Sequence, residues 1–312
     1  MSKVLLIDGT STFIRCYSAV ASMDINGVSN GGVVGTLSSL NFIINQCAPD
    51  KVIFVWDGIG GSKKRRSLLK DYKAQRKPTR LNRNFDHELI DTEKNKEDQR
   101  IRIHEYLNDL PIWKLEIDDI EADDTIAYLV KVFEKDNITI ASTDKDFYQL
   151  VGDKVNMFNT AKKMFVTKDD VLQKFNISTK NFTLARSMAG DDSDNIEGVR
   201  GVGLKTAVKL FPFLSEDNEY DLDHLFEFAR TSKDKKYDKI IFNEERIRLN
   251  FKVMNLKEMI ISYHSINKIN ESLKEAKHFN STAFRLKLME DGITSFGDGF
   301  FRTFRILNIK EE

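Results

Sequence analysis

Three short, largely apolar runs in this chain of 312 residues each end on an aspartate. The runs are 4–7, 52–56 and 138–143, and the aspartates that follow them are Asp8, Asp57 and Asp144. Runs of this kind are typical of strands buried on both faces, as in a parallel sheet covered by helices. Ligands of such sheets bind beyond the carboxyl ends of the strands. The three carboxylates are therefore expected to meet at one edge of a sheet.

Further acidic residues would lie beyond the same edge. They are Glu121, Asp123 and Asp124 in one cluster, Asp191 and Asp194 in another, and Asp146, which lies two residues after Asp144. Acids at a helix N-terminus are often ordinary capping residues, so no single cluster is decisive. Gathered carboxylates repel one another unless cations lie among them, however, and their hard oxygen atoms suit Mg²⁺ or Mn²⁺. We therefore predict a metal site that acts on phosphate groups.

A strongly basic segment lies between Ser62 and Arg83, in a chain whose formal net charge is zero. It holds ten lysines and arginines and a single acid, Asp71. A solvated helix face or a basic loop would by itself account for such a run. Beside an acidic metal site, the segment would supply the phosphate contacts that a polyanion needs. We expect a helix over 63–76 that breaks at Pro78, followed by a mobile arm.

A glycine-rich stretch, 198–206, follows the second acidic cluster. It nearly matches the P-loop pattern, but Leu204 occupies the lysine position and no buried strand precedes it, which excludes an ATP-binding loop. A glycine hairpin between helices can instead hold a phosphate on its backbone N–H groups, while its carbonyls hold a monovalent cation such as K⁺. Lys205 and Lys209, four residues apart, would extend the phosphate contact.

The composition, 41% apolar and 31% charged, describes a globular protein. No run reaches 18 apolar residues and the first residues enter a strand directly, so neither a membrane span nor a signal peptide is expected. Cys16 and Cys47 form no C-x-x-C pattern and fit a reducing cytoplasm. The five histidines lack the spacing of a zinc site.

Strand and helix patterns alternate as far as about residue 180, which predicts an α/β domain over 1–180. Beyond residue 168 helical periodicity dominates, and a helical region over 181–312 is expected. Additional strands are predicted within 111–117 and 155–166, and helices over 11–21, 33–46, 101–110 and 121–135. The last fifteen residues, which include Phe300, Phe301 and Phe304, could pack on the protein or dock a partner, and packing is favoured.

Six motifs occur in a fixed order along residues 3–212. They are DGT at 8–10, WD at 56–57, YKAQR at 72–76, EADD at 121–124, STDKD at 142–146, and GDDSDN at 190–195 with the hairpin that follows it. As a set they resemble the 5′-nuclease, or flap endonuclease, family, which includes the 5′-exonuclease domain of bacterial DNA polymerase I and stand-alone bacteriophage enzymes. The resemblance implies a PIN-like α/β core with a central, mostly parallel, twisted sheet. It also implies a helical arch over about 62–100 and a helix–three-turn–helix DNA-binding module over about 186–212, followed by C-terminal helices.

The resemblance implies roles for single residues as well. Two Mg²⁺ ions, which Mn²⁺ could replace, would be held by Asp8, Asp57, Glu121 and Asp123 on one side and by Asp124, Asp144, Asp146, Asp191 and Asp194 on the other. The arch residues at the scissile phosphate would be Lys73 and Arg76. Further DNA contacts would come from Arg65, Tyr72, Gly198, Gly201, Gly203, Lys205 and Lys209.

The implied function is that of a Mg²⁺-dependent 5′-3′ exonuclease and flap endonuclease, with RNase H activity on primers, in DNA replication or repair. Its partners would be DNA with 5′ flaps or 5′ ends, RNA/DNA primer junctions and replication proteins. The enzyme would be a monomer in the cytoplasm, or in the host cytoplasm if the chain comes from a phage.

Two other functions stay open. A PIN-type single-strand ribonuclease would share the strand-end acids, but it needs neither the second acidic cluster nor the glycine hairpin. A non-catalytic protein that binds branched DNA would keep the basic segment and the hairpin but could lose carboxylates, and all nine are present here.

Overall fold

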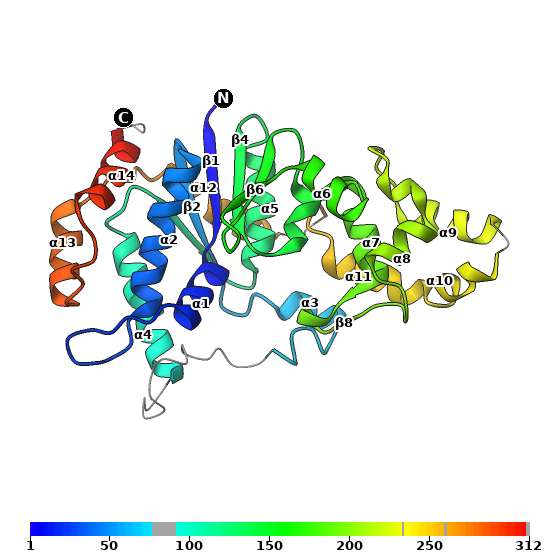
Figure 1. Cartoon of the computed structure of the whole chain (residues 1–312), viewed down its shortest axis with the longest axis horizontal. Coiled ribbons are helices and arrows are strands. Elements are labelled where there is room, and N and C mark those ends of the chain that lie inside the picture. The colour runs from blue at the N-terminus through cyan, green and yellow to red at the C-terminus, as the bar shows by residue number, and fades with distance from the viewer. Residues whose placement is uncertain (77–91, 233, 259–260, 310–312) are drawn as a thin grey trace.

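The computed structural model describes residues 1–76, 92–232, 234–258 and 261–309 (Figure 1). A six-stranded sheet forms its centre, in the order β3-β2-β1-β4-β5-β6. The strands are β1 (Lys3–Asp8), β2 (Lys51–Asp57), β3 (Trp113–Ile117), β4 (Asn137–Ser142), β5 (Val155–Asn159) and β6 (Met164–Val166). Every pair is parallel except β5–β6, which is antiparallel. The predicted α/β class with a mostly parallel central sheet is therefore confirmed.

Alternate residues of the central strand feed two separate cores, because successive side chains of a strand point to opposite faces. Leu5 and Ile7 of β1 pack with α1 (Gly9–Ala19), α2 (Gly31–Cys47) and α4 (Thr92–Leu107). Val4 and Leu6 pack with α5 (Ala122–Val132) and with buried residues of the helical region. This two-sided burial explains why the strand sequences are apolar throughout and do not alternate with polar residues.

The second half of the described chain is mainly helical, as the sequence predicted. It contains α6 (Lys168–Phe175), α7 (Phe182–Ala189), α8 (Leu204–Leu210), α9 (Leu222–Thr231), α10 (Asp238–Phe242) and α11 (Glu244–Met254). The sequence did not predict a short antiparallel ribbon between α7 and α8, formed by β7 (Gly190–Asp191) and β8 (Ile196–Glu197). This ribbon fixes the acidic cluster at the start of the glycine hairpin.

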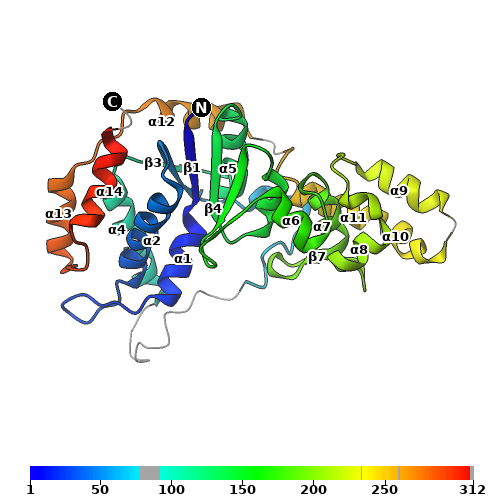
Figure 2. The ribbon, with the colours of Figure 1, turned by 45° about the horizontal axis from the view of Figure 1, so that its top comes forward.

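The last helices return to the α/β core. After α12 (Tyr263–Lys274), which contacts β3, come α13 (Ser281–Glu290) and α14 (Asp298–Ile309). In both views α13 and α14 lie at the end of the molecule opposite to α9 and α10 (Figures 1 and 2). Phe300, Phe301 and Phe304 are buried in the core that contains α2. The prediction that this segment packs on the protein is therefore confirmed.

The helix predicted over 63–76 is wrong beyond its first half. Helix α3 (Lys63–Leu68) ends early, Leu69 is extended, and Lys73 has a left-handed backbone with φ 57°. Tertiary contacts override the helical pattern here. The backbone N–H of Lys73 donates to the carbonyl oxygen of Asp194 at 2.9 Å, and Tyr72 is buried against Ile196 and α11. The expected break at Pro78 and the arm after it as far as residue 91 fall outside the described residues, whereas 92–100, the end of the predicted arch, form the start of α4.

None of the helices in the described ranges combines the length and the apolar character that a membrane span requires.

Candidate active site

An acidic cleft of about 510 Å³ opens at the carboxyl ends of the parallel strands. Its acidic lining residues are Asp8, Asp57, Asp123, Asp144 and Asp191. The structure thus brings the three strand-end aspartates together, as expected, and adds one carboxylate from the first turn of α5 and one from the ribbon. Four of the predicted ligands, Glu121, Asp124, Asp146 and Asp194, do not line this cleft.

The strand-end aspartates are held in place by backbone N–H groups. Asp8 caps α1, accepting from the N–H of Ser11 at 3.0 Å and from the Ser142 hydroxyl at 2.8 Å. Asp57 accepts from the N–H of Ala122 at 2.7 Å, and Asp144 from that of Asp146 at 2.8 Å. Capping and a functional role are therefore not exclusive, because the caps fix the carboxylates at the cleft.

The buried carboxylates raise one another's pKa values. Burial raises the pKa of Asp8 to about 7, and repulsion from Asp57 and Asp144 adds to this effect. Burial and repulsion from Asp144 and Asp8 raise the pKa of Asp123 well above its usual range. The pKa of Asp144 is raised by burial and by its acidic neighbours. A cation among these groups would remove their repulsion, so the cleft favours cation binding.

Two of the remaining carboxylates, Glu121 and Asp124, are paired with Arg65 and Lys73. Glu121 accepts hydrogen bonds from Lys73 Nζ at 2.5 Å and from Arg65. Burial raises the pKa of Glu121, but the two cations outweigh this effect and lower the pKa to about 2. Arg65 also holds Asp124 with two hydrogen bonds, at 2.8 and 2.9 Å. The Arg65 side chain is only 10% exposed. Its contact with DNA, which the resemblance implies, stays a prediction.

Tyr72 and Arg76 hold Asp194 beside the cleft. Arg76 Nη2 donates to Asp194 Oδ1 at 2.6 Å, and the buried Tyr72 hydroxyl lies 3.2 Å from Asp194 Oδ2 and 3.1 Å from Glu121 Oε2. The contact of Tyr72 with DNA is likewise still a prediction. Lys73 and Arg76 both line the cleft, although they lie on a turn and not on one helix face as the sequence indicated.

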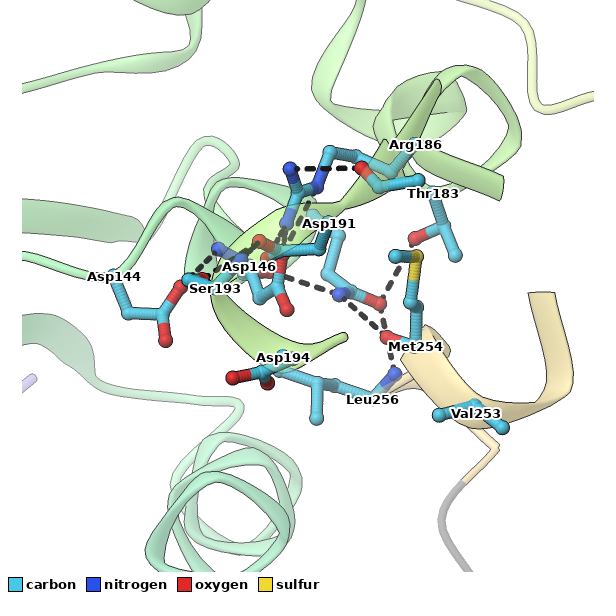
Figure 3. A network of polar contacts seen from close by, with 12 residues as sticks. Asp144, Asp146, Thr183, Arg186, Asp191, Ser193, Asp194, Val253, Met254 and Leu256 are labelled. Atoms are coloured by element: carbon cyan, nitrogen blue, oxygen red, sulfur yellow. Dashed lines mark hydrogen bonds and ion pairs between the residues drawn. The ribbon is translucent and has the colours of Figure 1, made fainter. Parts of the chain in front are cut away.

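Three arginines and lysines at the site were not predicted from the sequence. Arg15 and Lys145 line the cleft, and Arg186 on α7 lies between Asp146 and Asp191 (Figure 3). Burial and repulsion from Asp144 and Asp191 raise the pKa of Asp146 to about 7. Arg186 lowers the pKa of Asp191, against the effect of burial. A basic residue one turn before an acidic cluster was the signal available in the sequence.

The glycine hairpin has a buried side and an open side. A side chain at Gly198 would collide with the backbone of Ala189, so this glycine serves packing. Gly201, with φ 75°, and Gly203 face open space, since no atom beyond their immediate neighbours lies within 4 Å of the point that a Cβ would occupy. Lys205, in the first turn of α8, and Lys209, in its last turn, are both exposed. The backbone on the open side is therefore accessible.

The donor set of the cleft suits a divalent cation. Its carboxylates supply hard oxygen ligands, which Mg²⁺ and Mn²⁺ prefer. Among the described residues, no three potential ligands already stand close enough together to hold an ion.

An α/β core with an acidic cleft beside basic residues suits a protein that acts on phosphodiesters with the help of metal ions, and the sequence comparisons name the family. Residues 3–176 match the family described as 5′-3′ exonuclease, N-terminal resolvase-like domain. The chain is 30% identical over 239 residues to a 5′-3′ exonuclease of Bacillus subtilis (strain 168), covering 72% of this chain and 73% of that protein. The chain belongs to the 5′-3′ exonuclease family and is a 5′-nuclease, as its motifs indicated.

The structure is also similar to solved structures of the bacteriophage T5 D15 protein. One, co-crystallized with metal ions, has a TM-score of 0.66 and 17% identity, covering 99% of this chain and 100% of that one. Another, a flap endonuclease in a pseudo-enzyme-product complex with DNA and metal ions, has a TM-score of 0.63 and 20% identity, covering 93% and 99%. At these identities the similarity establishes the fold, and it confirms the predicted PIN-like core.

Proposed function

We propose that this protein is a structure-specific 5′-nuclease that hydrolyses phosphodiester bonds near 5′ ends and branch points of DNA. Mg²⁺ is its metal ion, and Mn²⁺ can replace it. The observation that carries the proposal is the lining of one cleft by buried and half-buried carboxylates together with Lys73 and Arg76. The carboxylates suit cations, and the two basic side chains suit the phosphate that those cations would act on.

Asp8, Asp57, Asp123 and Asp144 would hold the ions, because all four line the cleft and lie at fixed ends of the core elements. Bound there, divalent ions supply the activation of water and the stabilisation of charge at the scissile phosphate. Asp124, Asp146, Asp191, Asp194 and Glu121 lie around this group and would act through their basic partners or after a shift of side chain.

Lys73 and Arg76 would bind the scissile phosphate. In the described structure their charges are engaged by Glu121 and Asp194. A DNA phosphate would compete with these carboxylates for the same donors, so the two side chains exchange partners when substrate enters. Their positive charge would then stabilise the charge that develops on the phosphate during an in-line displacement.

The open side of the glycine hairpin would hold duplex DNA. Gly201 and Gly203 leave the backbone accessible to a phosphate, and Lys205 and Lys209 extend the contact along α8. Carbonyl groups of the hairpin would hold K⁺. We place this DNA-binding module at about 186–212, within a helical region that begins near residue 181.

The finer assignments follow from this proposal. The substrates are 5′ flaps, 5′ ends and RNA/DNA primer junctions, with RNase H activity on the primer. The protein acts as a monomer in the cytoplasm, together with replication proteins.

A comparison of substrates tests the proposal. The protein is incubated with a 5′-flapped duplex, a blunt duplex and a single-stranded RNA, each in Mg²⁺ and in excess chelator. We expect Mg²⁺-dependent cleavage near the branch of the flapped DNA and near the 5′ end of the duplex. Cleavage of the RNA alone would favour the PIN-type ribonuclease, and tight binding of branched DNA without any cleavage would favour a non-catalytic binding protein.

A further inference from the structure

Arg186 connects two parts of the molecule that lie on different elements. Its guanidinium donates to Asp146, which follows β4 of the core, from Nε at 3.2 Å and from Nη2 at 2.9 Å. The same Nη2 also donates to Asp191 of the ribbon. Nη1 lies 3.4 Å from the carbonyl oxygen of Gly190, where the ribbon begins. One side chain therefore links the core to the base of the glycine hairpin (Figure 3).

The backbone at Asp146 is also held by Gln149. The buried amide group of Gln149 donates to the carbonyl oxygens of Asp146 and Met254 at 2.8 and 3.0 Å. It accepts from the Thr183 hydroxyl at 2.9 Å and from the N–H of Leu256 at 2.8 Å. All the partners that Gln149 needs are present, so the loop that carries Asp146 is held by α7 and by the end of α11.

The charge balance around this loop depends on Arg186. The side chains of Arg186, Asp146 and Asp191 are only 12%, 16% and 15% exposed. Asp144 adds a third negative charge nearby. Buried like charges separate or stay protonated unless a cation compensates them. Arg186 supplies that cation from within the chain.

We propose that Arg186 is a positioning residue of the active site, an internal cation that holds Asp146 and Asp191 together and so aligns the glycine hairpin with the carboxylate cleft. This inference rests on the proposed function, in which the hairpin holds the duplex and the cleft acts on it. Asp191 also lines the cleft, so a shift of the ribbon would move a carboxylate of the site. Arg186 itself acts through these two acids.

The first test needs neither metal nor DNA. Thermal unfolding is measured in chelator for Arg186→Ala, for the pair Asp146→Asn with Asp191→Asn, and for the triple variant. Loss of a buried ion pair should lower the unfolding temperature by roughly 5 °C in the parent protein. In the background without the two charges, the same change should have no effect or should stabilise the protein, because it then removes an unpaired buried charge. An equal loss in both backgrounds would mean that Arg186 only fills space, and the inference would be wrong.

The second test separates positioning from binding. At saturating enzyme and Mg²⁺, Arg186→Ala should lower the single-turnover rate on a flapped DNA at least tenfold, with affinity in Ca²⁺ changed less than about threefold. Arg186→Lys, which keeps the charge, should recover most of the rate. A rate that Arg186→Lys does not recover, or a loss that lies wholly in affinity, would overturn the inference.

Arg248→Ala is the matched control. Arg248 also bridges two acids, Asp223 at 2.7 Å and Glu244 at 3.0 Å, but its side chain is 41% exposed. Exposed ion pairs contribute little to stability, so this variant should resemble the parent protein in both tests. If the parent protein cleaves no flapped or 5′-ended DNA, the proposed function is wrong. The comparison of unfolding temperatures among the Arg186, Asp146 and Asp191 variants still tests whether Arg186 holds the two acids together.

Discussion

Replacement of Lys73 by alanine tests whether the basic segment takes part in the chemistry or only attracts DNA. Lys73 lies on a turn with a left-handed backbone, lines the cleft, and places its ammonium group 2.5 Å from Glu121 Oε1. Its side chain is only 10% exposed. A cation in this position can act on one particular phosphate, whereas exposed lysines act on the DNA as a whole.

Lys73→Ala should affect the cleavage rate more than the stability of the fold. Loss of a preorganised charge at the phosphate should lower the rate on the order of a hundredfold, ~2.7 kcal/mol of transition-state stabilisation. The effect on folding should be smaller, about 1–2 kcal/mol, because Glu121 keeps Arg65 and Ser62 as partners. The variant should therefore fold and bind DNA while cleaving it slowly.

The assay is single-turnover cleavage of a 5′-flapped DNA at saturating enzyme, with affinity measured separately in Ca²⁺ and folding measured by urea unfolding. Lys63→Ala is the matched control, since Lys63 lines the neighbouring cavity of about 290 Å³ together with Lys73. The Lys63 side chain is 73% exposed and pairs with Asp119. Its loss should lower affinity slightly and reduce the salt dependence of binding by about one unit, with little effect on rate.

Equal losses of rate in the two variants would refute this reasoning, and so would a Lys73→Ala variant that loses affinity alone. Either result would make the segment an electrostatic clamp in which Lys73 has no special place. A variant that fails to unfold cooperatively would be replaced by Lys73→Met, which keeps most of the side-chain volume.

Three further predictions address the ions, the hairpin and pH. Asp144→Ala should abolish cleavage and leave DNA affinity in Ca²⁺ unchanged or tighter, because it removes a carboxylate from the cleft; near-normal turnover at saturating Mg²⁺ would refute the metal assignment. Gly201→Val should raise the dissociation constant for duplex substrates, since φ 75° is strained for a β-branched residue; unaltered affinity would leave the loop a simple connector. In chelator, the free energy of unfolding should fall as pH rises from about 4 to 7, because Asp8 and Asp146 have raised pKa values and the unfolded chain releases these protons first. Urea unfolding across this range, with and without Ca²⁺, measures the loss and its reversal by the cation.

The sheet and the position of its acidic edge could be predicted from the sequence alone. The runs that end on Asp8, Asp57 and Asp144 are apolar because both faces of their strands are covered, and the structure puts these aspartates in one cleft. These features can be predicted from local sequence, because the apolar residues of a strand indicate that both of its faces are buried. The carboxyl ends of parallel strands also lie at the same edge of a sheet. The ordered motifs then indicated the family, which the comparisons establish.

Which charged side chains pair with one another depends on tertiary packing and could not be predicted from the sequence. The pattern over 63–76 has helical spacing, but burial of Tyr72 and the contact of Lys73 with Asp194 end the helix after Leu68. Arg65 forms ion pairs with Glu121 and Asp124 in the interior of the protein. Arg186 donates a hydrogen bond to Asp146, which lies 40 residues earlier in the chain. The reason is physical: helix and strand periodicity depend on neighbours in sequence, whereas the partner of a buried charge depends on which elements pack together.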